Sequence, residues 1–110
     1  IAHKISERQL LEKVIELAEA GGWLVAHFRP ARTNKGWRTA IQGATGFPDL
    51  VLCRPPRLLF VELKRQGEVP TQAQADWLWK LSWCDKPSSV LWEPSHIPAI
   101  EEVLLGDRRL

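Results

Sequence analysis

Apolar residues recur three and four positions apart near the start of the chain, and this spacing predicts an amphipathic helix. Ser6 followed by Gln9 is a capping-box pattern that marks its first turn. Gly21-Gly22 should end the helix after Ala20. The residues that we expect to face the core are Leu10, Leu11, Val14, Leu17 and Ala18.

The rest of the hydrophobic pattern predicts short strands and two further helices. Expected strands lie at 23–29, 50–53, 60–64 and 89–92. Expected helices lie at 72–83, after the N-cap Thr71, and at 97–105. The order α-β-β-β-α-β-α predicts a single α/β domain over residues 1–110, with a mixed sheet and helices on its faces. The stretch after Gly106 is expected to fray.

Two of these strands should pair as a hairpin, because only the turn at residues 54–57 separates them. If the turn centre lies between Pro55 and Pro56, Asp49 falls opposite Glu62. Directly opposed residues hold their Cβ atoms about 4.5–5.5 Å apart. Lys64 lies two positions after Glu62 and shares its face. The pattern therefore brings two carboxylates and one ammonium group together at a strand end.

This cluster has a functional and a structural interpretation. Two close carboxylates repel each other unless a cation lies between them, and carboxylate oxygens are ligands that Mg²⁺ prefers. The alternative is a surface ion pair between Glu62 and Lys64 at an exposed sheet edge. The turn Gly46-Phe47-Pro48 before Asp49, and the apolar residues of both strands, favour a functional site.

Glu7 extends the apolar stripe of the first helix toward its N-terminus, since it precedes Leu10 and Leu11 by three and four positions. It could reach a site at the end of the sheet. It could equally be a carboxylate that only interacts favourably with the helix dipole. The spacing alone does not choose between the two.

Composition indicates a globular domain with one core and no membrane-spanning segment or signal peptide. The two cysteines form no metal-ligand pattern, so we expect reduced thiols in a cytoplasmic setting. Trp79 and Trp83 share one helix face and could mark an interface, although a large core could absorb them.

Charge is distributed unevenly, although the net charge is only +2. No Asp or Glu occurs between Ala20 and Pro48. We expect residues 30–45 to form a long loop, a feature that is usually functional or mobile. Trp37 within it could stack on a base or pack under the loop. The basic residues that we expect to contact phosphates are Arg29, Arg32, Lys35 and Arg38.

Three motifs together resemble a known family. They are Gly46-Phe47-Pro48-Asp49, Glu62-Leu63-Lys64, and Gln74 followed by Trp77-Leu78. With the leading helix that carries Glu7, they resemble the VRR-NUC (virus-type replication-repair nuclease) domain, a branch of the PD-(D/E)xK nuclease superfamily. The resemblance extends from about Ser6 to Leu105. It implies a restriction-endonuclease-like fold and hydrolysis of DNA phosphodiester bonds with Mg²⁺ or Mn²⁺.

The resemblance also implies roles for individual residues. Asp49 and Glu62 would bind the metal, with help from the backbone carbonyl of Leu63. Lys64 would orient or deprotonate the attacking water and offset negative charge. Glu7 would complete the metal shell, directly or through water.

Gln74 would hold this network from the second helix. The stretch Thr71-Gln72-Ala73 departs from the Thr-Pro-Glu expected there, which bears on where that helix begins. Similar stand-alone proteins of phages and bacteria resemble Holliday-junction resolvases and act as homodimers, so branched DNA is the expected partner and a bacterial or phage-infected cell the expected setting. A nuclease for flaps or single strands, and a DNA-binding module without catalysis, remain alternatives.

Overall fold

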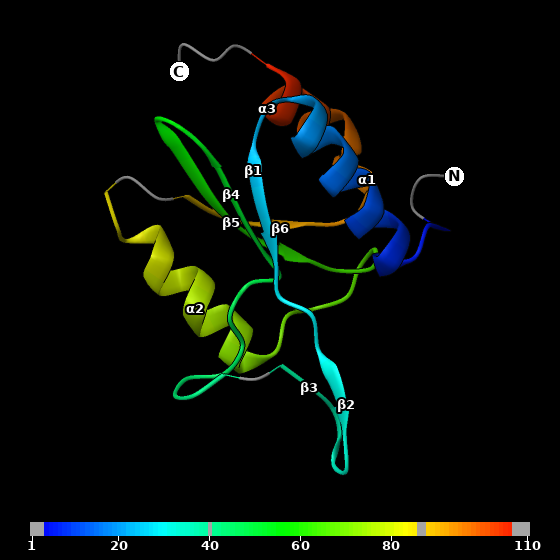
Figure 1. Ribbon diagram of the computed structural model, residues 1–110, viewed down its shortest axis with the longest axis vertical. Coiled ribbons are helices and arrows are strands. Elements are labelled where there is room, and N and C mark those ends of the chain that lie inside the picture. Colours follow the sequence, from blue (N-terminus) through cyan, green and yellow to red (C-terminus); the bar gives the residue numbers. More distant parts are fainter. Residues whose placement is uncertain (1–3, 40, 86–87, 107–110) are drawn as a thin grey trace.

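The computed structural model describes residues 4–39, 41–85 and 88–106 (Figure 1). Its helices are α1 (Glu7–Ala20), α2 (Gln72–Ser82) and α3 (Ile97–Leu105), the last preceded by the short 3-10 helix η2 (Pro94–His96). Its strands are β1 (Leu24–His27), β2 (Ala31–Thr33), β3 (Gly36–Arg38), β4 (Leu50–Arg54), β5 (Arg57–Leu63) and β6 (Ser88–Trp92). The stretch 107–110, which we expected to fray, lies outside the described residues.

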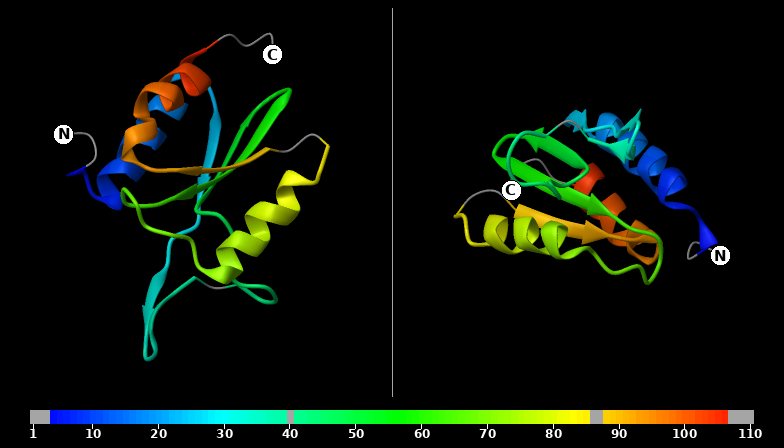
Figure 2. Two further views of the ribbon diagram at one scale, coloured as in Figure 1. Left: turned by 180° about the vertical axis from the view of Figure 1, so that it is seen from behind. Right: turned by 90° about the horizontal axis from the view of Figure 1, so that it is seen from below.

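Four strands form the main sheet in the order β1-β4-β5-β6. Neighbours pair antiparallel except β5 and β6, which run parallel. Helices α1 and α3 lie side by side on one face of the sheet, and α2 lies on the other (Figures 1 and 2). This arrangement confirms the predicted mixed sheet with helices on its faces. Within the described residues, no helix is long and apolar enough to cross a membrane.

The core lies between the sheet and the α1/α3 layer. Alternate residues of β4 and β5, such as Leu50, Leu52 and Val61, are fully buried there against Leu10 and Val14 of α1. Helix α2 contributes no fully buried residue, so its face of the sheet is less completely covered. Because side chains alternate along a strand, Asp49 and Glu62 belong to the α2 face.

The predicted hairpin register is confirmed. Leu50 pairs with Val61, and the pairing continues in step to Arg54 and Arg57. The turn is tighter than expected, because only Pro55 and Pro56 lie outside the two strands.

The prediction of an unbroken loop over residues 30–45 is wrong. Strands β2 and β3 form a separate two-stranded hairpin there, with Arg32 paired to Trp37. The signal was present, since two three-residue segments flank the turn Asn34-Lys35, but Gly36 suggested a break. With a positive φ of 100°, Gly36 instead lets the second strand begin directly after the turn.

Both predicted helix starts are confirmed as capping boxes. The Ser6 hydroxyl accepts from the Gln9 N–H, and the Gln9 side chain accepts from the Ser6 N–H. The same reciprocal pair joins Thr71 and Gln74 at the start of α2. The departure from Thr-Pro-Glu before Gln74 therefore leaves the start of this helix intact.

Arg54 is a structural residue that the sequence analysis assigned only to a turn. It is 6% exposed, and its guanidinium donates to the carbonyls of Gly21 (3.0 Å), Leu104 (3.1 Å) and Gly106 (3.4 Å). It also lies over the ring of Trp23 at 4.6 Å. Because these carbonyls lie at the C-terminal ends of α1 and α3, the Arg54 cation interacts favourably with both helix dipoles. Its hydrogen bonds also hold the two helices to the hairpin.

We predict that Arg54→Met lowers the free energy of unfolding by about 2–4 kcal/mol, because several carbonyls lose a charged donor. Arg57→Met is the matched control. Arg57 also lies over Trp23, at 5.8 Å, but makes no side-chain hydrogen bond among the described residues. Its loss should stay under about 1 kcal/mol. Urea unfolding followed by circular dichroism measures both, and equal losses would show that the hydrogen bonds do not matter.

Candidate active site

The turn before β4 is packed against the start of α2, which fixes where Asp49 begins its strand. Gly46 has a positive φ of 87°, and a Cβ at this position would lie 2.6 Å from the backbone carbon of Ala73. A side chain here is therefore excluded by both conformation and space. Pro48 is fully buried behind it.

The ring of Phe47 anchors the same turn. It makes edge-to-face contacts with Trp77 of α2 at 4.9 Å, with Phe28 at 5.4 Å and with Phe60 of β5 at 5.9 Å. Such pairs add to the stabilisation that comes from burial alone. One side chain thus connects the turn to α2, to the end of β1 and to the central hairpin.

Asp49 itself joins the ends of three strands. Its Oδ2 accepts from the Leu63 N–H at 2.9 Å, and its backbone carbonyl accepts from the Phe28 N–H at 3.0 Å. The first bond crosses the hairpin to Leu63, the residue after Glu62, which the predicted register placed opposite Asp49. The carboxylate is held in place by backbone rather than by a flexible side chain.

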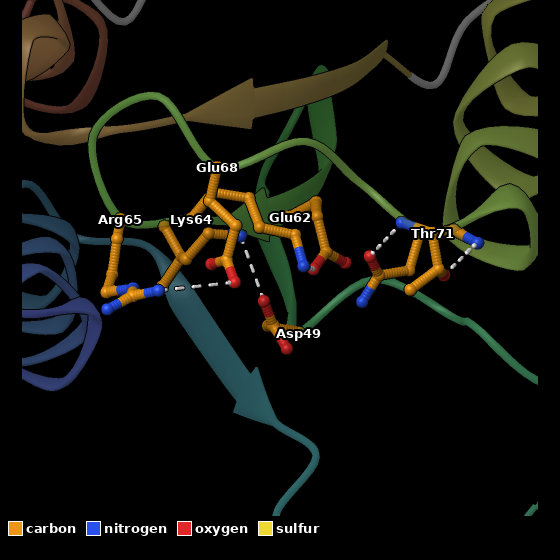
Figure 3. A network of polar contacts seen from close by, with 8 residues as sticks. Asp49, Glu62, Lys64, Arg65, Glu68 and Thr71 are labelled. Atoms are coloured by element: carbon orange, nitrogen blue, oxygen red, sulfur yellow. Dashed lines mark hydrogen bonds and ion pairs between the residues drawn. The ribbon is translucent and has the colours of Figure 1, made fainter.

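Glu62 and Lys64 are buried beside it, and Figure 3 shows their side chains pointing toward one another near Asp49. Glu62 is 2% exposed and Lys64 is 7% exposed. The Lys64 ammonium lies 3.8 Å from Glu62 Oε2. Glu62 Oε1 is buried without a hydrogen-bond partner among the described residues. Burial excludes the alternative of a surface ion pair at an exposed sheet edge.

Burial raises the pKa of Glu62 to about 8, and the neighbouring Asp49 carboxylate adds to the rise. Lys64 lowers it, but not enough to offset these two effects. Without a further cation, Glu62 therefore holds its proton more tightly than an ordinary glutamate does. The site is short of positive charge, which is the condition that a bound divalent cation would relieve.

Glu7 reaches the same end of the sheet from α1, the helix on the other face of the sheet from α2. It lines a cavity of about 230 Å³ together with Asp49 and Leu63. Loss of contact with water raises the pKa of Glu7, Asp49 adds to the rise, and Lys64 opposes it. Glu7 is exposed, and the observation that favours its membership of the site is its place on the cavity wall beside Asp49.

The chemistry of these residues fits a hard divalent cation. The donors are carboxylate oxygens, and the unpartnered Oε1 of Glu62 is a buried acceptor that lacks a ligand. Across residues 4–39, 41–85 and 88–106, no three His, Cys, Asp or Glu side chains converge closely enough to hold a metal in this conformation. Glu7 lines the cavity wall together with Asp49, and the three carboxylates do not form a complete metal shell in this conformation.

Gln74 is placed at the N-terminus of α2, where Gly46 approaches the helix. Its side-chain carbonyl accepts from the Thr71 N–H, and none of its recorded hydrogen bonds reaches Asp49, Glu62 or Lys64. The predicted connection to the acidic residues is therefore not formed in this arrangement. The basic residues Arg32, Lys35 and Arg38 lie on the β2–β3 hairpin, and Arg29 lies just before it, all exposed.

His27 is a residue whose position at the site we did not predict. It is half-buried at the end of β1, pairs with Leu50 and lines the same cavity as Glu7 and Asp49. No pairing partner for β1 could be inferred from the sequence, so His27 was not placed beside Asp49 in advance. Knowledge of the β1–β4 register would have revealed it.

No protein-family model matches the sequence, and no curated protein sequence matches it. One solved structure, described as a VRR_NUC domain, superimposes with a TM-score of 0.65 over 89% of this chain and 97% of that one. This chain has the VRR-NUC fold. The two sequences are 21% identical, so the likeness concerns the fold, and the roles of individual residues rest on their geometry.

The lack of positive charge beside Asp49 and Glu62 predicts that the stability of the metal-free chain depends on pH. The pKa of Glu62 rises from 4.5 to about 8 on folding. Between these values the folded state holds more protons than the unfolded state, so stability must fall as pH rises. One such group contributes a slope of at most about 1.4 kcal/mol per pH unit.

Glu62→Gln should remove most of this slope, whereas Glu68→Gln, an exposed neighbour, should keep it. The measurement is urea unfolding in EDTA at several pH values between 5 and 8. A slope that survives in Glu62→Gln would mean that Glu62 does not hold the extra proton.

Proposed function

We propose that the chain is a divalent-metal-dependent DNA endonuclease that hydrolyses phosphodiester bonds. The observation that carries the proposal is the half-buried Asp49 next to the buried Glu62 and Lys64, with one Glu62 oxygen left without a partner among the described residues. Such a cluster lowers the stability of the folded state, since it brings carboxylates together in a poorly hydrated place. Costly arrangements of this kind are typical of functional sites. The VRR-NUC fold supports the nuclease class.

Asp49 and Glu62 would hold Mg²⁺, or Mn²⁺ in its place, with the Leu63 carbonyl as a further oxygen ligand. Glu7 would close the metal shell from the cavity wall, directly or through water. When bound, the cation supplies Lewis-acid assistance, because it offsets charge on the phosphate and makes a nearby water easier to deprotonate.

Lys64 is suited to positioning and charge stabilisation rather than to acting as the sole base. Its ammonium lies 3.8 Å from a Glu62 oxygen and near the Asp49 carboxylate (Figure 3). A charged ammonium donates hydrogen bonds, so it can orient water and stabilise the negative charge that develops on the phosphate. Gln74 could support the site from α2 through its side-chain NH2, since its side-chain carbonyl already accepts from the Thr71 N–H.

DNA would approach along the exposed basic residues of the β2–β3 hairpin. Because a four-way junction is resolved by two symmetric cuts, we propose a homodimer acting on branched DNA, with flaps and single strands as alternative substrates. The test is incubation of the purified chain with labelled four-way junction, flap, single-stranded and duplex DNA in Mg²⁺, Mn²⁺ or EDTA. Cleavage that requires the metal supports the proposal, and no cleavage of any substrate contradicts it.

We predict that Asp49→Asn and Glu62→Gln each abolish cleavage and leave DNA binding in EDTA largely intact. Either change removes a charged oxygen ligand, whereas neither residue lies on the basic hairpin. Glu7→Gln should slow cleavage at saturating Mg²⁺ by at least about tenfold, the effect expected of a group that supports a metal shell.

Helix α1 supplies matched controls for Glu7. Glu12, Glu16 and Glu19 are exposed carboxylates of the same helix, as Glu7 is, but they do not line the cavity that Glu7 shares with Asp49. Their substitution by Gln should change the rate little. If Glu12→Gln is the inactive variant, the assignment of the helix face is wrong. If no α1 variant is impaired, the site works without a helix carboxylate.

A further inference from the structure

The β2–β3 hairpin has no place in the hydrophobic core. All of its residues are exposed except Gly36, and it extends away from the main sheet and the helices (Figures 1 and 2). Its strands pair only with each other. A short two-stranded ribbon is marginally stable alone, so an arm of this kind gains most from a surface that it contacts.

Trp37 is the large apolar side chain of this arm and is 62% exposed. It pairs directly with Arg32 across the hairpin, and the Arg32 guanidinium lies 5.8 Å from the centre of its ring. The structure therefore does not show Trp37 packed under a loop. It shows a planar aromatic ring oriented by a cation and left largely open to solvent.

The positive charge around Trp37 indicates a negatively charged partner. Arg32, Lys35 and Arg38 lie on the same arm, and within the described residues none of them pairs with a carboxylate at 4.0 Å or less. Because opposed residues share a face, Arg32 lies on one face of the ribbon and Arg38 on the other. An aromatic ring between cations matches a nucleobase flanked by phosphates.

The arm begins beside the catalytic cavity. Pro30, which immediately precedes β2, lines the cavity that contains Asp49 and Glu7. Arg32, the partner of Trp37, is two residues farther along an extended strand, a distance of about 7 Å. DNA advances about 3.4 Å per nucleotide along the helix axis, so this length of strand corresponds to roughly two nucleotide steps.

We propose that Trp37 stacks on an unpaired nucleobase close to the cut phosphate, while Arg32, Lys35 and Arg38 contact the flanking phosphates. This inference rests on the proposed nuclease function and assigns the arm a role in choosing the substrate. In a continuous duplex every base is already stacked between its neighbours, and the ring has no partner. At a branch, a flap or a frayed end, an unpaired base is available, and the arm favours such DNA.

The test compares two labelled DNAs in EDTA, so that binding is measured without cleavage. One is a fully paired duplex and the other is the same duplex with a short single-stranded flap. Fluorescence anisotropy gives the dissociation constant of each for the unmodified chain, Trp37→Ala, Trp37→Phe and Trp79→Ala. Trp79 is a matched control, because it is 61% exposed and its ring, like that of Trp37, has one neighbouring side chain. That neighbour is Trp83, with the ring centroids 5.5 Å apart.

Trp37→Ala should weaken binding to the flap DNA between about fivefold and about 150-fold, the affinity equivalent of one stacked base. Binding to the duplex should change by less than about twofold, and the salt dependence should stay unchanged because no charge is removed. Trp37→Phe should retain part of the preference, and Trp79→Ala all of it.

Three results would overturn the inference: no loss in Trp37→Ala, an equal loss for duplex and flap, or the same loss in Trp79→Ala. Because the assay contains no metal, its outcome is independent of catalysis. A flap preference that depends on Trp37 in a chain that cleaves nothing would reject the nuclease and keep the stacking arm. Metal-dependent cleavage by a chain whose flap preference does not depend on Trp37 would keep the nuclease and reject the stacking arm.

Discussion

Two carboxylates held together in a poorly hydrated place are the constraint on which the rest of this structure depends. Asp49 is tied to the Leu63 N–H, and Glu62 is buried beside it with one oxygen unpartnered. Lys64 supplies one positive charge, and the pKa of Glu62 still rises to about 8. The arrangement is costly to the folded state in the absence of a further cation, which is why we interpret it as a functional site.

The protein holds this pair with rigid elements and carries its exposed basic residues elsewhere. The Gly46 turn packs on α2, Phe47 connects the turn to three neighbouring rings, and Arg54 holds the far end of the hairpin to α1 and α3. The basic arm and Trp37 lie outside this framework. Such a division allows exact placement of the carboxylates and, under the proposed function, would allow an adaptable contact with DNA.

Local signals in the sequence predicted the parts of the fold that depend on local physics. The turn at Pro55-Pro56 set the register of β4 and β5, and Ser6 and Thr71 marked two helix starts. Interactions between distant segments were not predictable from these signals. The carbonyls that Arg54 meets come from residues far along the chain, and His27 reaches the cavity only through the β1–β4 pairing.

The most direct test of the account is a crystal of the chain grown or soaked with Mn²⁺ and measured for anomalous scattering. The account predicts one strong peak bonded to Asp49 and Glu62 at about 2.1 Å, with Glu7 beside it or joined through water. In a parallel crystal of Asp49→Asn the peak should weaken or disappear. A peak elsewhere, or none while Glu62 keeps its contact with Lys64, would contradict the claim that this hairpin end is a metal-dependent active site.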